Sequence, residues 1–200
     1  MDRREIFNLP NCLTALRIAL TPIFLLLLFA DTWYWKSLAF VVFSAASLTD
    51  LYDGKLARAG NQETPLGRFL DPLADKILVT SALVALVLNK MVNFWIVLPI
   101  VGRDILITGI RLYGLSQGKQ MVTTRLAKWK TAAQLTTVLF ILLVIGVEET
   151  VERFAANSSF FLDDQLIQLL ANVLLAGVLL LTLLSGFHYL FRAMFSYKES

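Results

Sequence analysis

Six long apolar stretches, separated by short polar segments, dominate the hydrophobic pattern of this 200-residue chain. They cover residues 12–31, 35–58, 66–89, 92–116, 126–147 and 165–194. A helix needs about 20 mostly apolar residues to cross a bilayer, and each stretch reaches that length. The pattern therefore predicts an all-α integral membrane protein with six transmembrane helices.

The first ten residues mix charged and apolar side chains and end at Pro10. Such a segment suits a short N-terminal interfacial helix that lies against the lipid head groups. We do not expect a cleavable signal peptide, because the apolar run that follows continues through Arg17 and Pro22 instead of ending at a cleavage site.

Composition supports a membrane protein and excludes several chemistries. Hydrophobic residues make up 57% of the chain and charged residues 16%, against about a quarter charged in soluble domains. We therefore expect a single membrane domain over residues 1–200. A single cysteine, Cys12, and a single histidine, His188, exclude an intrachain disulfide and a Cys/His zinc site. The net charge of +3 without a long basic run favours membrane lipids over nucleic acid as partners.

Lysine and arginine are unevenly divided between the two sides that this topology creates. With a cytoplasmic N-terminus, eleven fall on the cytoplasmic side, while Lys36, Lys90 and Arg153 fall on the other side. The positive-inside rule therefore predicts a multi-pass protein of the cytoplasmic membrane with both termini cytoplasmic. The acidic segment 148–165 is then an external loop.

Four aspartates cluster where the second apolar stretch ends and the third begins. Asp50 and Asp53 are three residues apart, and Asp71 and Asp75 are four apart, so each pair shares one face of a helix. A turn over residues 59–66 would return the chain and let the two faces meet near the cytoplasmic interface. Ionisable residues within membrane segments are costly, so this cluster is a candidate functional site.

Clustered carboxylates repel one another unless a cation lies between them. Oxygen ligands favour hard divalent cations such as Mg²⁺ or Mn²⁺, and two such ions can bridge a phosphate. Gly54 and Gly67 leave room for a phosphate to approach the backbone, and Arg58 can neutralise its oxygens. The alternative is an internal salt-bridge network in which the aspartates pair with Arg58, Arg68 and Lys76.

This segment resembles the signature of CDP-alcohol phosphatidyltransferases, D-x2-D-G-x2-A-R-x8-G-x3-D-x3-D. All of its fixed positions are present, as Asp50, Asp53, Gly54, Ala57, Arg58, Gly67, Asp71 and Asp75. The resemblance implies the CDP-alcohol phosphotransferase fold, commonly homodimeric, in an enzyme that displaces CMP from a CDP-linked lipid with an alcohol.

The resemblance also implies roles for individual residues. Asp50, Asp53 and Asp71 would hold two divalent cations, while Asp75 would be a further ligand and the general base for the acceptor hydroxyl. The contacts to CDP-diacylglycerol would come from Gly54, Ala57, Arg58, Thr64 and Gly67, together with Asn11 and Thr14 at the polar start of the first helix.

The signature leaves the acceptor alcohol open, and the second half of the chain must identify it. Five basic residues are candidates for binding an acceptor phosphate: Arg103, Arg111, Arg125, Lys128 and Lys130. A dianionic phosphate needs such a cluster, whereas serine or choline does not. The block from residue 118 to 131 resembles that of bacterial phosphatidylglycerophosphate synthases, which implies sn-glycerol 3-phosphate as the acceptor.

Three alternatives remain open. The acceptor could be an inositol phosphate, phosphatidylglycerol or serine within the same family. The basic residues could serve only topology, and Arg103 with Asp104 could hold helices together. A cation transporter could also use intramembrane aspartates, although it has no need for Arg58 or for the glycines beside them.

Overall fold

The computed structural model describes residues 9–60, 65–117, 125–154 and 163–196, with side chains for most of residues 12–49, 70–117, 126–154 and 163–187. The described residues form six α-helices. These helices are α2 (Leu9–Leu28), α3 (Trp33–Gly60), α4 (Pro65–Leu88), α5 (Phe94–Ser116), α6 (Arg125–Phe154) and α7 (Asp164–Ser196). The predicted all-α class is confirmed for this part of the chain.

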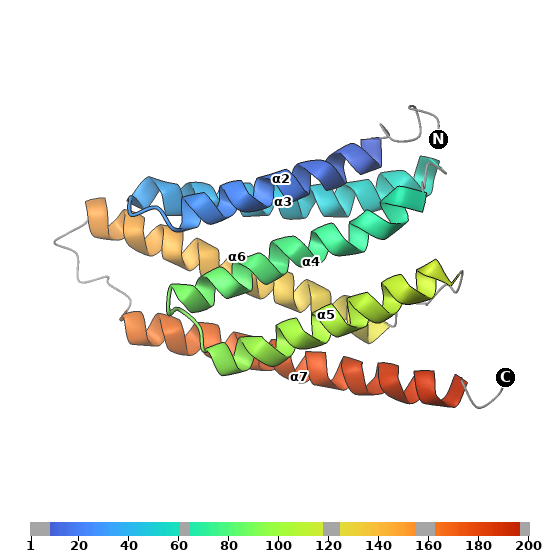
Figure 1. Cartoon of the computed structure of the whole chain (residues 1–200). Coiled ribbons are helices and arrows are strands. Elements are labelled where there is room, and N and C mark those ends of the chain that lie inside the picture. Colours follow the sequence, from blue (N-terminus) through green and yellow to red (C-terminus); the bar gives the residue numbers. More distant parts are fainter. Residues whose placement is uncertain (1–8, 61–64, 118–124, 155–162, 197–200) are drawn as a thin grey trace.

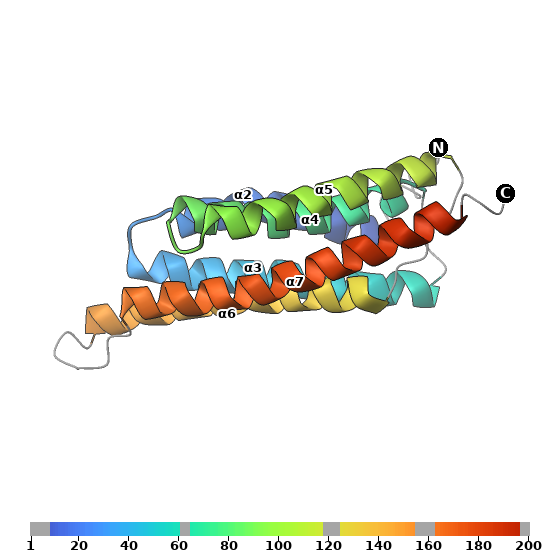
Figure 2. The ribbon, with the colours of Figure 1, turned by 90° about the horizontal axis from the view of Figure 1, so that it is seen from below.

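The helices form an elongated bundle of two layers (Figures 1 and 2). One layer contains α2, α4 and α5, and the other contains α3, α6 and α7. Within the layers, α4 packs against both α2 and α5, and α6 packs against both α3 and α7, while α2 with α3 and α5 with α7 join the layers. The last turns of α3 and the first turns of α4 lie at one end of the bundle, which we call the signature end.

The helix bounds agree with the predicted apolar stretches to within a few residues, except at the end of α6. We expected a loop from Glu148, but α6 continues to Phe154. Two contacts explain the extension. Lys36 on α3 forms an ion pair with Glu149, and the Thr150 hydroxyl donates a hydrogen bond of 2.6 Å to the Gly146 carbonyl. The acidic residues that lower the hydropathy here therefore belong to the helix.

Two helices of the bundle have the length and composition of membrane spans. Within the described residues, Leu126–Val151 and Asp164–Phe187 are long and apolar enough to cross a bilayer, and Cys12–Leu28 is a shorter apolar helix. Most of the predicted interfacial helix, residues 1–8, lies outside the described part of the chain.

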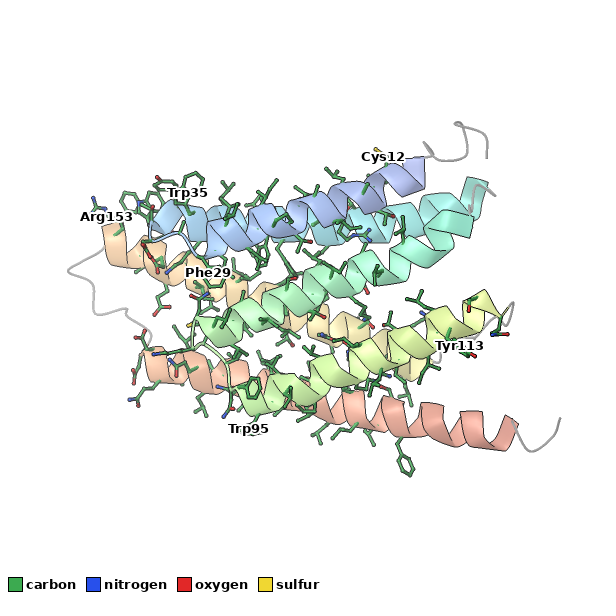
Figure 3. All side chains as sticks on the ribbon, viewed as in Figure 1. Cys12, Phe29, Trp35, Trp95, Tyr113 and Arg153 are labelled. Carbon is green, nitrogen blue, oxygen red and sulfur yellow. The ribbon has the colours of Figure 1, made fainter. Side chains whose placement is uncertain are left out.

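Aromatic side chains gather at the end opposite the signature end. Figure 3 places Trp35 and Trp95 there, on α3 and α5. Trp95 is exposed, and its ring lies edge-on against Phe94. Tryptophan is enriched where a membrane meets water, so these positions suit interfacial anchors. In the apolar core between the two ends, the rings of Phe24 and Phe43 contact each other at a tilt, with centroids 5.2 Å apart.

Candidate active site

The residues of the aspartate signature lie on two helix ends that are close in the fold. The backbone places Asp50 and Asp53 in the last turns of α3, and Asp71 and Asp75 in the first turns of α4. Both segments belong to the signature end (Figure 1). The predicted turn is shorter than expected, because α3 continues to Gly60 and α4 begins at Pro65. Its middle, including Thr64, lies outside the described residues.

The chemistry of the four aspartates fits a hard divalent cation. They offer only carboxylate oxygens, the donors that Mg²⁺ and Mn²⁺ prefer. Among the side chains that the structure describes, no group of three or more His, Cys, Asp or Glu forms a metal site elsewhere. Asp75 is described and half-buried, while the side chains of Asp50, Asp53 and Asp71 are outside the described set. The assignment of these four residues as metal ligands therefore rests on their positions at the facing ends of α3 and α4.

Asp75 is paired with its neighbour in the chain. Its Oδ2 lies 3.5 Å from Lys76 Nζ, and the side chains are 25% and 22% exposed respectively. The salt-bridge alternative that the sequence left open therefore holds at this one position. Because the pair is partly solvated, its contribution to stability is small.

A buried ion pair lies behind Lys76, between α5 and α6. Both carboxylate oxygens of Asp104 are 2.5 Å from Lys130 Nζ. Lys130 is 0% exposed and Asp104 2% exposed. The same ammonium group donates a hydrogen bond to Gln134 Oε1, one turn along α6. Charges at this depth persist only when they are paired and hydrogen-bonded, and these contacts satisfy that condition.

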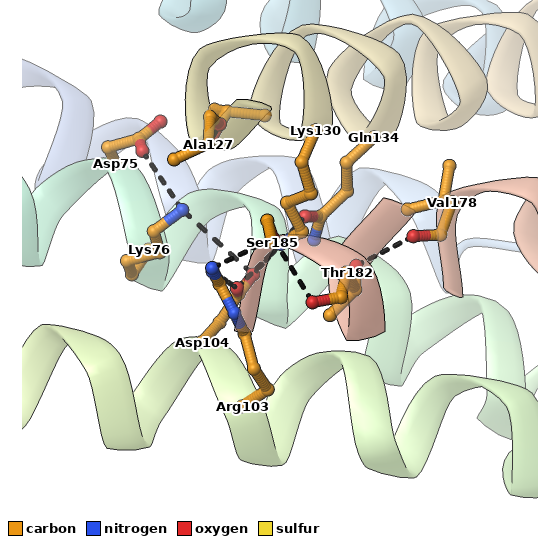
Figure 4. A network of polar contacts seen from close by, with 11 residues as sticks. Asp75, Lys76, Arg103, Asp104, Ala127, Lys130, Gln134, Val178, Thr182 and Ser185 are labelled. Atoms are coloured by element: carbon orange, nitrogen blue, oxygen red, sulfur yellow. Dashed lines mark hydrogen bonds and ion pairs between the residues drawn. The ribbon is translucent and has the colours of Figure 1, made fainter. Parts of the chain in front are cut away.

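Arg103 extends the same network to α7. Its Nη1 lies 3.2 Å from Asp104 Oδ1, and its Nη2 donates a hydrogen bond of 2.9 Å to Ser185 Oγ. Ser185 in turn donates to the Thr182 carbonyl at 3.0 Å. A Cβ on Gly186 would lie 3.6 Å from Arg103 Nε, an ordinary van der Waals distance, so the guanidinium packs directly against α7. Figure 4 shows the whole network.

Positive charge exceeds negative charge in this network. Lys76, Arg103 and Lys130 come from α4, α5 and α6 and all lie within 3.9 Å of Asp104. Among the side chains that the structure describes, Lys76 is balanced by Asp75, so the excess of one positive charge belongs to Arg103 and Lys130, which share Asp104. In a site partly shielded from water, such an excess attracts an anion of small size, such as a phosphate group.

The structure brings together two of the five basic residues proposed for an acceptor phosphate. Arg103 and Lys130 share Asp104, so part of their charge is already neutralised. Arg111 is half-buried two turns further along α5, and Lys128 is exposed on a different side of α6 from Lys130. The side chains of Arg125 and Asn11 lie outside the described set, and Thr14 is fully buried on α2.

Several residues of this region carry a role that sequence patterns alone did not reveal. Arg17 is 1% exposed, and its Nε donates a hydrogen bond of 3.4 Å to the Ala46 carbonyl on α3. Its side chain is therefore held inside the bundle, between α2 and α3. Gln134 and Ser185 complete the buried network, although nothing in their sequence surroundings distinguishes them from other polar residues in helices.

Comparison with known proteins identifies the class to which this bundle belongs. The sequence model of the CDP-alcohol phosphatidyltransferase family matches residues 7–184. The chain therefore belongs to the CDP-alcohol phosphatidyltransferase family, as its aspartate signature indicates.

The chain is also similar to particular enzymes, each named CDP-diacylglycerol–glycerol-3-phosphate 3-phosphatidyltransferase. It is 40% identical over 150 residues to the one from Bacillus subtilis, covering 68% of this chain and 77% of that protein. It is 41% identical over 141 residues to the one from Pseudomonas fluorescens, covering 68% and 72%. For Escherichia coli K12 the identity is 37% over 141 residues, covering 68% and 77%.

Proposed function

We propose that this protein transfers the phosphatidyl group of CDP-diacylglycerol to sn-glycerol 3-phosphate, forming phosphatidylglycerophosphate and CMP. Family membership and the names of its relatives support the reaction. The observation that carries the choice of acceptor is the excess of positive charge that Arg103 and Lys130 hold over Asp104, one side chain away from Asp75. The dianionic phosphate of an acceptor such as sn-glycerol 3-phosphate can bind this positive charge, whereas serine carries no net charge.

The transfer replaces the phosphoanhydride bond of the diphosphate with a phosphate ester bond to the acceptor. The primary hydroxyl oxygen of the acceptor attacks the phosphorus that carries diacylglycerol, and the bond from that phosphorus to the oxygen of CMP breaks. Asp75 takes the hydroxyl proton as general base. Holding both substrates in one site makes the attack effectively intramolecular.

Divalent cations are part of this proposal, and family membership supports them. Asp50, Asp53 and Asp71, with Asp75 as a further ligand, would hold two Mg²⁺ or Mn²⁺ ions. When bound, these ions neutralise the diphosphate and stabilise the departing CMP. The remaining contacts to CDP-diacylglycerol are assigned to Gly54, Ala57, Arg58, Thr64, Gly67, Asn11 and Thr14.

The acceptor phosphate is assigned to the basic residues around the network, which are Arg103, Arg111, Arg125, Lys128 and Lys130. Arg103 and Lys130 also bind Asp104, so they hold a fixed geometry before the acceptor arrives. Such prior ordering reduces the entropy that binding would otherwise lose.

We further propose that the described helices are six membrane spans of one domain covering residues 1–200. The first turn of α2 and the last turn of α7 lie at the signature end (Figure 1), and the positive-inside rule favours the cytoplasm for that end. The protein then works in the cytoplasmic membrane with both termini and the active site cytoplasmic. By family resemblance we expect a homodimer.

Release of CMP tests this function. Purified protein in liposomes is supplied with CDP-diacylglycerol and Mg²⁺, and one acceptor is added at a time. We expect release with sn-glycerol 3-phosphate and none with serine, inositol phosphate or phosphatidylglycerol. Release with one of those three instead would identify a related enzyme with another acceptor. A cation transporter would release no CMP under any condition.

A further inference from the structure

Lys76 lies between two carboxylates, one in the aspartate signature and one in the buried network. We propose that Lys76 is a positioning residue, whose ammonium group is anchored by Asp104 and fixes the orientation of the Asp75 carboxylate. This inference rests on the proposed function, because the orientation of Asp75 matters for catalysis only if the protein transfers a phosphatidyl group.

The distances place the ammonium group where it can act on both acids. Lys76 Nζ is 3.5 Å from Asp75 Oδ2 and 3.9 Å from Asp104 Oδ2. Figure 4 shows the ammonium group between the two carboxylates. Neighbouring residues on a helix point about 100° apart, so they do not normally face each other. A second partner on another helix is therefore needed to keep the flexible lysine side chain in one place, and Asp104 on α5 is that partner.

Asp104 is well suited to be an anchor, because it is held from two further sides. Both of its oxygens bind Lys130, and Oδ1 also binds Arg103. Lys130 is fixed by Gln134, and Arg103 by Ser185 on α7. A carboxylate with these partners, only 2% exposed, has little freedom to rotate. Lys76 therefore ties the signature helix α4 to a rigid part of the bundle.

Stability does not account for this arrangement. Lys76 and Asp75 are both partly exposed, and ion pairs of that kind contribute little to folding. Binding of the acceptor is also a poor explanation, because Lys76 already faces two carboxylates. A small misplacement of a catalytic group, by contrast, can lower the rate by about 100-fold. The effect of losing Lys76 should therefore appear in turnover.

Two variants and one control test the proposal in the full-length protein in detergent. Lys76→Gln removes the charge, and Lys76→Arg keeps it. Lys90→Gln makes the same change at an exposed lysine at the opposite end of the bundle. We expect Lys76→Gln to lower kcat by about 10- to 100-fold, with KM for both substrates unchanged. We expect Lys76→Arg to recover most of the turnover and Lys90→Gln to match the wild type.

Two further measurements separate positioning from other roles. Thermal unfolding and Mn²⁺ titration of Lys76→Gln, both without substrates, should match the wild type. An unchanged kcat, a raised KM for sn-glycerol 3-phosphate alone, a loss of folded protein alone or a loss of Mn²⁺ affinity would each overturn the proposal. If the wild type itself releases no CMP with sn-glycerol 3-phosphate, the proposed function fails first, and the two failures are therefore distinguishable.

Discussion

Lys130 on α6 and Asp104 on α5 form an ion pair that is closed to solvent in the interior of the bundle, with 2.5 Å between Nζ and each carboxylate oxygen. The pair explains how a lysine is accommodated within the apolar part of α6, the segment Leu126–Val151. Removing one partner of a buried pair leaves the other charge without compensation, which costs more than the pair itself contributes.

The first prediction follows from this pair. Lys130→Met should lower the free energy of unfolding by about 3 kcal/mol, the lower end of the range for broken buried pairs, because Arg103 still faces Asp104. Lys128→Met, at an exposed position on the same helix, should change it by less than about 0.5 kcal/mol. Denaturant unfolding in detergent measures both. Equal stability of the two variants would show that the buried pair has no structural role.

The second prediction concerns the contact between α3 and α6. A Cβ on Gly146 would lie 3.3 Å from the Cα of Ser37, whereas a Cβ on Gly177 of α7 meets nothing within 4 Å. Gly146→Ala should therefore lower the free energy of unfolding by about 1 kcal/mol relative to Gly177→Ala. Gly177→Ala meets no clash and gains the higher helix propensity of alanine. Thermal unfolding of the two variants checks this. A Gly146→Ala variant as stable as Gly177→Ala would mean that α3 and α6 can separate easily.

The pattern of apolar residues was sufficient to predict the six helices. The spacing of the aspartates was sufficient to recognise the family signature. The predicted end of α6 was wrong. Hydropathy falls at Glu148, but the helix continues to Phe154 because Lys36 pairs with Glu149. A hydropathy pattern describes only neighbouring residues, so it cannot predict an ion pair between residues 113 positions apart in the chain.

The expected alternative that Arg103 and Asp104 hold helices together is confirmed, but their partners on α6 and α7 could not be predicted, for the same reason. Lys130 is buried, and its partner Asp104 lies 26 residues away on another helix. Ser185, which binds Arg103, lies 82 residues away from it. Such pairings depend on how the helices are arranged in space, and spacing within one helix carries no information on that arrangement.

The third prediction tests the metal site. Asn in place of Asp50, Asp53 or Asp71 keeps the size of the side chain and removes its charge, so divalent cations should bind weakly and turnover should fall by orders of magnitude. CMP release measured over a series of Mg²⁺ concentrations checks each variant. Asp31→Asn, at an exposed position between α2 and α3, is the matched control. Full activity in all three signature variants would contradict the metal assignment.

The fourth prediction tests the acceptor site at Arg111, which is half-buried on α5. Arg111→Gln should raise KM for sn-glycerol 3-phosphate by about 10-fold or more, as expected for a lost charge-assisted hydrogen bond, and should affect KM for CDP-diacylglycerol much less. Steady-state titration of each substrate gives the two values, with Lys90→Gln as the control. If both constants change together, Arg111 supports the fold or the topology rather than the acceptor.

The identity of the lipid product tests the central claim most directly. Wild-type protein in liposomes that contain CDP-diacylglycerol is given Mg²⁺ and an equimolar mixture of sn-glycerol 3-phosphate, serine and inositol 1-phosphate, and the lipids are analysed by mass spectrometry. Our account predicts phosphatidylglycerophosphate as the product, formed in the same amount as CMP. Phosphatidylserine or phosphatidylinositol phosphate as the main product, or no new lipid, would contradict it.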